Sequence, residues 1–258
     1  MKLNKYILLV ITAITSVIYT SCSKSNDAEP TVSGTGKVQL EFENLVGEEP
    51  LVLNTETYKN AHGDSYNITT FKYYVSNISL VKEDGSSYKV PESYLLMDAS
   101  EPQSRFQTLE GIPAGDYKAI NFTIGVDSAR NFAGAQTNAL DPAHGMFWAW
   151  SSGYIFVKFE GTSPQSTAKG NTLTFHIGGA KSPTNTIRTA TQTFGGNLLR
   201  VRDNSKPEVH FAVNAATMFT GKANVDFAAL NFTMGGVNSV IVADNYASSF
   251  ITVEHIHN

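Results

Sequence analysis

The stretch GIPAGDYKAINFTIG, residues 111–125, joins a tight turn to an alternating strand. Glycine, proline and aspartate dominate its first part, and these are the residues that turns favour. Ile120, Phe122 and Ile124 then recur at every second position, which is the pattern of a strand with one buried face. A turn that leads straight into such a strand is typical of antiparallel β proteins.

The same two signals recur on both sides of this stretch. Val38, Leu40 and Phe42 alternate with polar residues, and a β-rich run at residues 71–81 leads to a turn at 83–86. Further strands are predicted at residues 88–90, 154–160, 173–177, 209–213 and 251–256. Many short strands at close spacing predict an all-β fold, a single antiparallel β-sandwich or barrel-like domain with short helices.

Helices are predicted to be few. Charged residues make up 16% of the chain, below the usual quarter, and abundant Gly, Thr, Ser and Asn favour turns and strands over long helices. Short helical pieces are predicted at Asp127, at Asp141 and at residues 214–219. The net charge of −4, without a basic stripe, argues against a nucleic-acid partner.

The first residues indicate export. Lys2 and Lys5 precede an apolar stretch at residues 6–18, which is short for a membrane span and has the size of a signal-peptide core. Small residues then lead to Cys22, the only cysteine in the chain. This order predicts a lipoprotein signal peptide at residues 1–21 and acylation of Cys22. The alternative is an ordinary cleaved signal with an incidental cysteine.

An acylated Cys22 would hold the protein to the cell envelope by its lipid alone. We expect the outer membrane, with the domain on its periplasmic or outer side. Residues 22–36 are mostly Ser, Asn, Asp, Glu, Pro, Thr and Gly, which predicts a flexible tether. Residues 37–258 suit one domain. This domain has no thiol of its own, so a metal site in it needs His, Met, carboxylate or aromatic ligands.

Residues 140–161, LDPAHGMFWAWSSGYIFVKFEG, are the most unusual stretch. Both tryptophans of the protein lie here, and on a strand Trp148 and Trp150 would share a face. His144 and Met146 lie just before them. Imidazole and thioether groups are soft enough to bind Cu(I) in an exported protein. The plain alternative for the tryptophan pair is core packing.

Four ordered motifs carry a family resemblance. They are YYVSNI at residues 73–78, IGVD at 124–127, GMFWAW followed by GY at 145–154, and HIGG at 176–179. In these motifs the chain resembles the MbnP-like copper-binding proteins, which are associated with methanobactin operons. The resemblance implies bound copper beside histidines and one tryptophan, Trp148 or Trp150, oxidised to kynurenine by a partner dihaem enzyme, an MbnH-like oxidase.

The candidate metal ligands are His62, His144, Met146 and His176. His62 lies in a predicted turn, where loop residues often carry function, and His176 begins the HIGG motif. For each candidate the alternative is ordinary packing or solvation. His210 is predicted to be exposed. His255 and His257 would point the same way on a strand, and their role stays open between a chelating pair and a disordered end.

No enzyme is predicted, because the sequence has no G-x-S-x-G, H-E-x-x-H, P-loop or dinucleotide motif. The main hypothesis is a copper-binding or copper-handling lipoprotein. The alternative is a surface lipoprotein that binds carbohydrate or a protein partner through an aromatic platform, and a redox enzyme is a third option. Histidines that converge on the tryptophans favour the metal, whereas an open aromatic shelf without histidines favours sugar.

Overall fold

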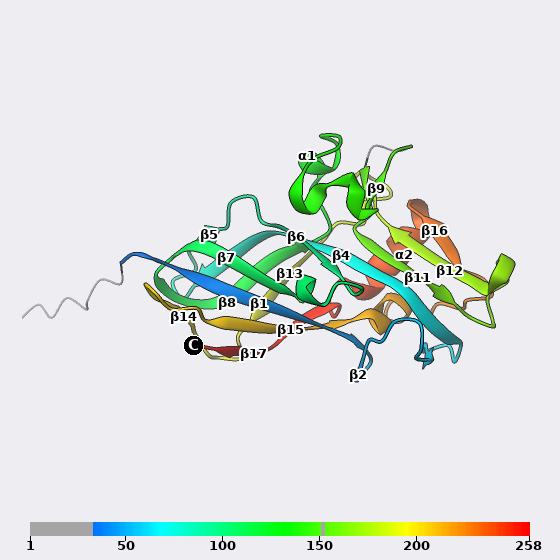
Figure 1. The fold of residues 1–258 in the computed structure, drawn as a ribbon, viewed down its shortest axis with the longest axis horizontal. Coiled ribbons are helices and arrows are strands. Elements are labelled where there is room, and N and C mark those ends of the chain that lie inside the picture. Colours follow the sequence, from blue (N-terminus) through cyan, green and yellow to red (C-terminus); the bar gives the residue numbers. More distant parts are fainter. Residues whose placement is uncertain (1–32, 151–152) are drawn as a thin grey trace, which may run out of the picture. The chain divides into compact units, whose positions relative to one another are not determined.

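Two large sheets face each other in the computed structural model, which describes residues 33–150 and 153–258 (Figure 1). The first sheet has the order β17-β15-β1-β2, and β7 also pairs with β1. Its strands are β1 (Thr35–Val46), β2 (Glu49–Pro50), β7 (Phe106–Pro113), β15 (Glu208–Asn214) and β17 (Ile251–His257). Among the described residues β17 therefore lies at one edge of this sheet.

The second sheet has the order β13-β8-β4-β11-β12-β16. Its main strands are β4 (Ser65–Lys82), β8 (Gly115–Ile124), β11 (Val157–Thr162), β12 (Thr172–Ile177), β13 (Arg188–Thr193) and β16 (Phe232–Met234). Shorter strands extend it: β3 (Tyr58–Lys59), β5 (Ser87–Lys89), β6 (Tyr94–Asp98) and β14 (Leu199–Val201). The first three of these pair with β4, which thereby connects most of the sheet.

The helices are short. They are α1 (Ser128–Asn131), α2 (Gly236–Tyr246) and the 3-10 turns η1 (Pro102–Arg105), η2 (Asn138–Leu140), η3 (Pro142–His144), η4 (Lys169–Asn171) and η5 (Ala215–Phe219). The Asp127 carboxylate accepts the first N–H groups of α1, and the Asp141 carboxylate does the same for η3. The predicted starts of these two pieces are confirmed.

The core lies between the two large sheets. Phe42 of β1 stacks on Phe211 of β15 with ring centroids 4.9 Å apart, and Phe122 of β8 meets Phe211 edge-on at 6.0 Å. Phe42 and Phe122 occupy the alternating positions seen in the sequence, and burial of such side chains is the main stabilising contribution. The predicted all-β, sandwich-like fold is confirmed.

Strand direction differs from the expectation in two places. β1 pairs with β15, and β12 pairs with β16, in parallel, whereas an antiparallel arrangement was predicted throughout. Parallel neighbours need a long crossover connection, and such pairings leave no turn signal in the sequence. A further difference is α2, whose 11 residues were not predicted to be helical.

The predicted signal peptide at residues 1–21 and Cys22 lie outside the described residues, as does most of the predicted tether. β1 begins at Thr35, just inside the end of the predicted tether at residue 36. Within the part of the chain that the structure describes, no helix is long and apolar enough to cross a membrane.

Candidate functional site

The strand β9, labelled in Figure 1, begins a short hairpin to which both tryptophans belong. β9 (Phe147–Trp148) pairs with β10 (Gly153–Tyr154), so that Trp148 lies opposite Gly153. Trp150 lies in the turn that follows β9. We call β9, β10 and Trp150 the tryptophan hairpin.

Buried contacts hold the base of the tryptophan hairpin. The Tyr154 hydroxyl donates to the carbonyl of Leu140, and the Tyr154 N–H donates to the side chain of Asn131, each at 2.8 Å. Met146 and Tyr154 are fully buried in an apolar cluster that also contains Tyr74. A two-stranded hairpin is at best marginally stable alone, so its order comes from this underlying cluster.

The two indoles differ in their exposure. Trp148 is 7% exposed and Trp150 is 70% exposed. Their ring centroids lie 5.4 Å apart with the planes tilted by 38°, so one packed ring contacts one solvated ring. The Trp148 indole nitrogen Nε1 is buried and has no hydrogen-bond partner among the described residues, which is uncommon and costly for a polar group.

Trp148 packs on the segment that follows β12. A Cβ atom at Gly178 would lie 2.8 Å from Cη2 of Trp148 and 2.6 Å from the carbonyl oxygen of Tyr154, so glycine makes room for the ring. Nearby, the Gly235 N–H donates to the carbonyl of His176 at 3.2 Å. Side chains two residues apart on an extended segment point to one face, with Cα atoms about 7 Å apart. Trp148 therefore packs just beyond the end of β12, against a glycine two residues after His176.

His176 is itself largely buried. Its Nε2 lies 2.7 Å from a carboxylate oxygen of Glu160, and Lys158 Nζ lies 3.5 Å from the same oxygen. The hydrogen bond with His176 is the main cause that lowers the pKa of Glu160 to about 2; Lys158 and Thr70 lower it further, and burial opposes them. Because Glu160 is ionised at neutral pH, a neutral His176 donates through Nε2 and keeps its Nδ1 lone pair for a ligand.

Strand register aligns four side chains beneath the tryptophan hairpin. The row runs through Lys72, Lys158, His176 and Met234. The ammonium groups of Lys72 and Lys158 each lie 3.4 Å from a backbone carbonyl, that of His144 and that of Gly145 respectively. The row therefore faces the segment that leads into the hairpin. Sequence reasoning missed Met234, since only the parallel pairing of β12 with β16 brings it beside His176.

His144 and Met146 flank the start of the tryptophan hairpin. The His144 Nε2 lies 3.0 Å from the carbonyl oxygen of Asn138, which again leaves Nδ1 for a ligand if Nε2 carries the proton. The Met146 side chain is fully buried, the packing role that methionine often has in cores. The structure thus places Met146 in the same buried cluster as Trp148 and His176 two residues before the glycine on which Trp148 packs, whereas the His144 side chain lines a hollow beside β6.

The structure places His62 elsewhere. Its Nδ1 lies 3.2 Å from the carboxylate of Asp64, and Asp226 completes a group whose ligand atoms all lie within 4.8 Å of one another. This group lies before the start of β4, whereas Lys72, which approaches the hairpin segment, lies further along the strand. At about 3.3 Å per residue along β4, the His62 group and Lys72 are roughly 20 Å apart.

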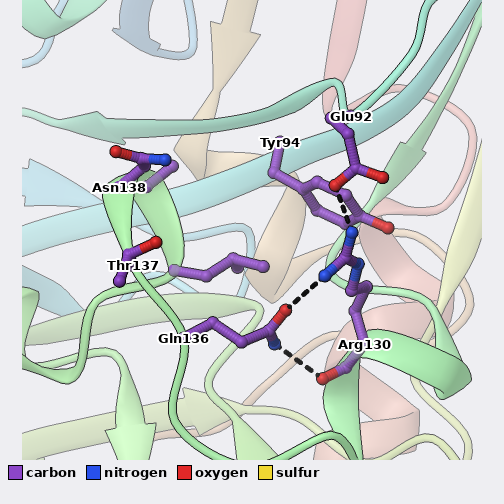
Figure 2. Close-up of a pocket in the computed structure, with 8 residues that line it drawn as sticks. Glu92, Tyr94, Arg130, Gln136, Thr137 and Asn138 are labelled. Atoms are coloured by element: carbon purple, nitrogen blue, oxygen red, sulfur yellow. Dashed lines mark hydrogen bonds and ion pairs between the residues drawn. The ribbon is translucent and has the colours of Figure 1, made fainter.

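A hollow of about 290 Å³ lies between β6 and the segment that follows α1. Figure 2 shows Arg130 between Glu92 and Gln136. Arg130 forms an ion pair with Glu92 and donates to the Gln136 side chain at 3.0 Å, and the Gln136 amide donates back to the Arg130 carbonyl at 2.9 Å. The guanidinium is therefore held by two protein side chains.

Comparison with known proteins agrees with the resemblance seen in the motifs. The family model MbnP matches residues 35–239. The chain belongs to the MbnP family. The solved structure of MbnP from Methylosinus trichosporium matches with a TM-score of 0.55 and 14% sequence identity, over 87% of this chain and 99% of that chain. At this identity the likeness shows a shared fold. No curated protein matches the sequence.

The MbnP match covers the tryptophan hairpin together with His176 and Met234. It ends before β17, so His255 and His257 lie beyond it.

Proposed function

We propose that this MbnP-family protein is exported, anchored by a lipid on Cys22, and binds copper beside the tryptophan hairpin without being an enzyme. The packing of Trp148 against Gly178, two residues after His176, carries the proposal. The resemblance to copper-binding MbnP-like proteins supports the choice of metal. The anchor has a separate test, since a Cys22→Ala variant should leave the membrane fraction; a variant that stays there would contradict it.

The ligand chemistry supports copper at this place. His176 offers an imidazole nitrogen and Met234 a thioether, and both suit Cu(I). Glu160 orients the His176 ring from behind, as carboxylates commonly do for metal-bound imidazoles. His144, on the segment that leads into the hairpin, offers a second imidazole. Met234 is 37% exposed, so its side chain is accessible to an incoming ion.

A His176→Gln variant is expected to weaken Cu(I) binding by more than about tenfold, the lower end of what loss of an outer-shell partner alone costs. Glutamine keeps a hydrogen-bond donor for Glu160 and removes the imidazole ligand. Competition with a chromophoric Cu(I) chelator measures the affinity, and His62→Gln serves as the control because His62 lies elsewhere. Equal affinities in wild type and His176→Gln would overturn the proposed site.

We further propose that Trp148 or Trp150 becomes kynurenine through a dihaem MbnH-like oxidase. Oxidation opens the indole ring to N-formylkynurenine, and hydrolysis then releases formate, so that the side chain loses one carbon and gains one oxygen overall. The partner enzyme supplies the oxidising equivalents, and water or peroxide supplies the oxygen. Exposed Trp150 is accessible to such a partner and contacts Trp148. Peptide mapping of protein from the native host should find the modified peptide over residues 146–154, and protein from a host without the oxidase should lack it. Unmodified tryptophans in copper-replete native cells would contradict this step.

One observation favours a second function. The flat Trp150 ring is 70% exposed, as a sugar-stacking residue would be. In that case a Trp150→Ala variant would lose glycan binding, whereas the His176→Gln variant would keep it. Screening both variants against the same glycans separates the two functions.

A further inference from the structure

Three imidazoles gather on the outer face of the first sheet. They belong to His210 of β15 and to His255 and His257 of β17. The His210 ring centroid lies 4.3 Å from that of His255 and 5.1 Å from that of His257, and the latter two lie 5.0 Å apart. One ligand nitrogen from each residue lies within 4.8 Å of the others. The sequence analysis left the role of His255 and His257 open and did not connect them with His210.

Strand register explains why the three rings converge. His210 is paired with His255 and Glu208 with His257 across the antiparallel strands β15 and β17. Val209 on β15 points into the core and is fully buried, so His210 and Glu208 point outward. An irregularity in the ladder beside His210 keeps His255 and His257 on this outer face. The sequence predicted an exposed His210. In the structure His210 is half-buried, because side chains of β1 and β17 cover it.

Two carboxylates border the imidazoles. Glu41 of β1 is opposite His210 in the parallel ladder, and its Oε2 lies 3.3 Å from His210 Nδ1. Glu208 Oε1 lies 3.8 Å from His210 Nε2. That Nε2 is buried and has no hydrogen-bond partner among the described residues. With Nδ1 turned to Glu41, the unpartnered Nε2 is the atom free for a ligand.

The carboxylates are themselves held in place. Arg105 lies 3.3 Å from Glu41, and Gln39 donates to the Glu208 carboxylate at 2.9 Å. The outward-facing side chains of β1 and β15 thus form a half-buried surface beside the two exposed histidines of β17. Glu41 would orient the His210 ring in the way that outer-shell carboxylates orient metal-bound imidazoles.

We propose that His210, His255, His257 and Glu208 bind a divalent first-row transition-metal ion, Zn²⁺ or Cu²⁺, with Glu41 as the positioning residue for His210. Imidazole nitrogens with one carboxylate oxygen suit these ions. Metal–nitrogen bonds of about 2.0–2.1 Å place tetrahedral ligand nitrogens about 3.3 Å apart. The exposed side chains of His255 and His257 close the remaining gap by small rotations about their side-chain bonds.

This site is separate from the proposed copper site. It lies on the first sheet, whereas the tryptophan hairpin packs against the second, and Figure 1 shows β17 and β9 well apart. The residues His255 and His257 also lie outside the family match. A metal ion here would join the edge strand β17 to β15 and so stabilise the last strand of the sheet.

The test uses the full chain, purified in detergent without a polyhistidine tag and stripped of metal. Zn²⁺ titration against a chromophoric chelator should give one ion per chain at this site. The double variant His255→Gln/His257→Gln should lose that ion, and Glu41→Gln should bind it about 10–100-fold more weakly. Both histidines of the double variant are exposed, so the fold should persist.

Two matched measurements decide the outcome. His176→Gln is the control, because it removes the proposed copper ligand on the other sheet and should leave Zn²⁺ binding unchanged. Cu²⁺ added to the His176→Gln protein should show coupling to several nitrogens in its electron paramagnetic resonance spectrum, and the His176→Gln protein that also carries the double variant should not. Equal Zn²⁺ affinity in wild type and the double variant overturns the proposal, even if the copper site at the hairpin proves correct.

Discussion

A Phe159→Ala variant is expected to lower the free energy of unfolding by about 3–5 kcal/mol, the usual cost of removing a buried phenylalanine. Phe159 of β11 is fully buried. Its ring centroid lies 5.0 Å from that of Phe219 and 6.1 Å from that of Phe175, each in an edge-on contact. The variant would leave a cavity among aromatic side chains, and their neighbours on two strands limit how far it can collapse.

Denaturant unfolding measures this effect as a lower midpoint with an unchanged slope. Phe232→Ala is the matched control, since Phe232 of β16 is 55% exposed and its loss should change stability by no more than about 0.5 kcal/mol. Similar midpoints for the two variants would show that Phe159 is not a core residue.

A Gly178→Ala variant is expected to displace Trp148 and, with it, the proposed copper site. The added Cβ would lie 2.8 Å from the Trp148 ring and 2.6 Å from the backbone carbonyl of Tyr154. A carbonyl in a paired strand cannot turn aside as a flexible side chain can, so the hairpin must move. Overpacking of this kind typically costs about 1–3 kcal/mol.

Fluorescence of a Trp150→Phe background isolates this effect, because the protein has only two tryptophans and Trp148 then reports alone. Gly178→Ala should shift its emission to longer wavelength and weaken Cu(I) binding. Gly115→Ala is the control, since its Cβ would make contacts of ordinary length with the flexible end of Lys82 at 3.4 Å and with the Tyr117 ring at 3.8 Å. An unchanged spectrum in Gly178→Ala would mean that Trp148 does not pack on this glycine.

The strands with one buried face were readable from the sequence because burial of one face imposes a period of two. β1 and β15 belong to this class, and both are found. β13 was missed because its residues RTATQT are partly or fully exposed, so no apolar alternation marks it. α2 was missed because Val237, Val240 and Ile241 are β-branched and suggest a strand, whereas packing of Val242 and Tyr246 against the core favours the helix.

Some residues of the candidate sites could be recognised from the sequence, and others only from the strand pairing. The tryptophans and His176 stood out because they belong to rare motifs in the sequence. Met234 was missed and His210 was predicted only to be exposed, since each acquires its neighbouring candidate ligands only from strand register. His255 and His257 were recognised as pointing the same way, but the third imidazole lies across the ladder on β15.

The parallel pairing of β1 with β15 has a consequence for the time course of folding. Gln39 and Glu208, which this pairing brings into hydrogen-bonding contact, are 169 positions apart in the chain. Contacts of such long range form slowly, because the loop must close before they contribute stability. An exported chain would therefore emerge with β1 unable to complete its sheet until β15 had followed. During that interval Val38, Leu40 and Phe42 lack one neighbouring strand, which makes β1 the segment that a holding chaperone would best protect from aggregation.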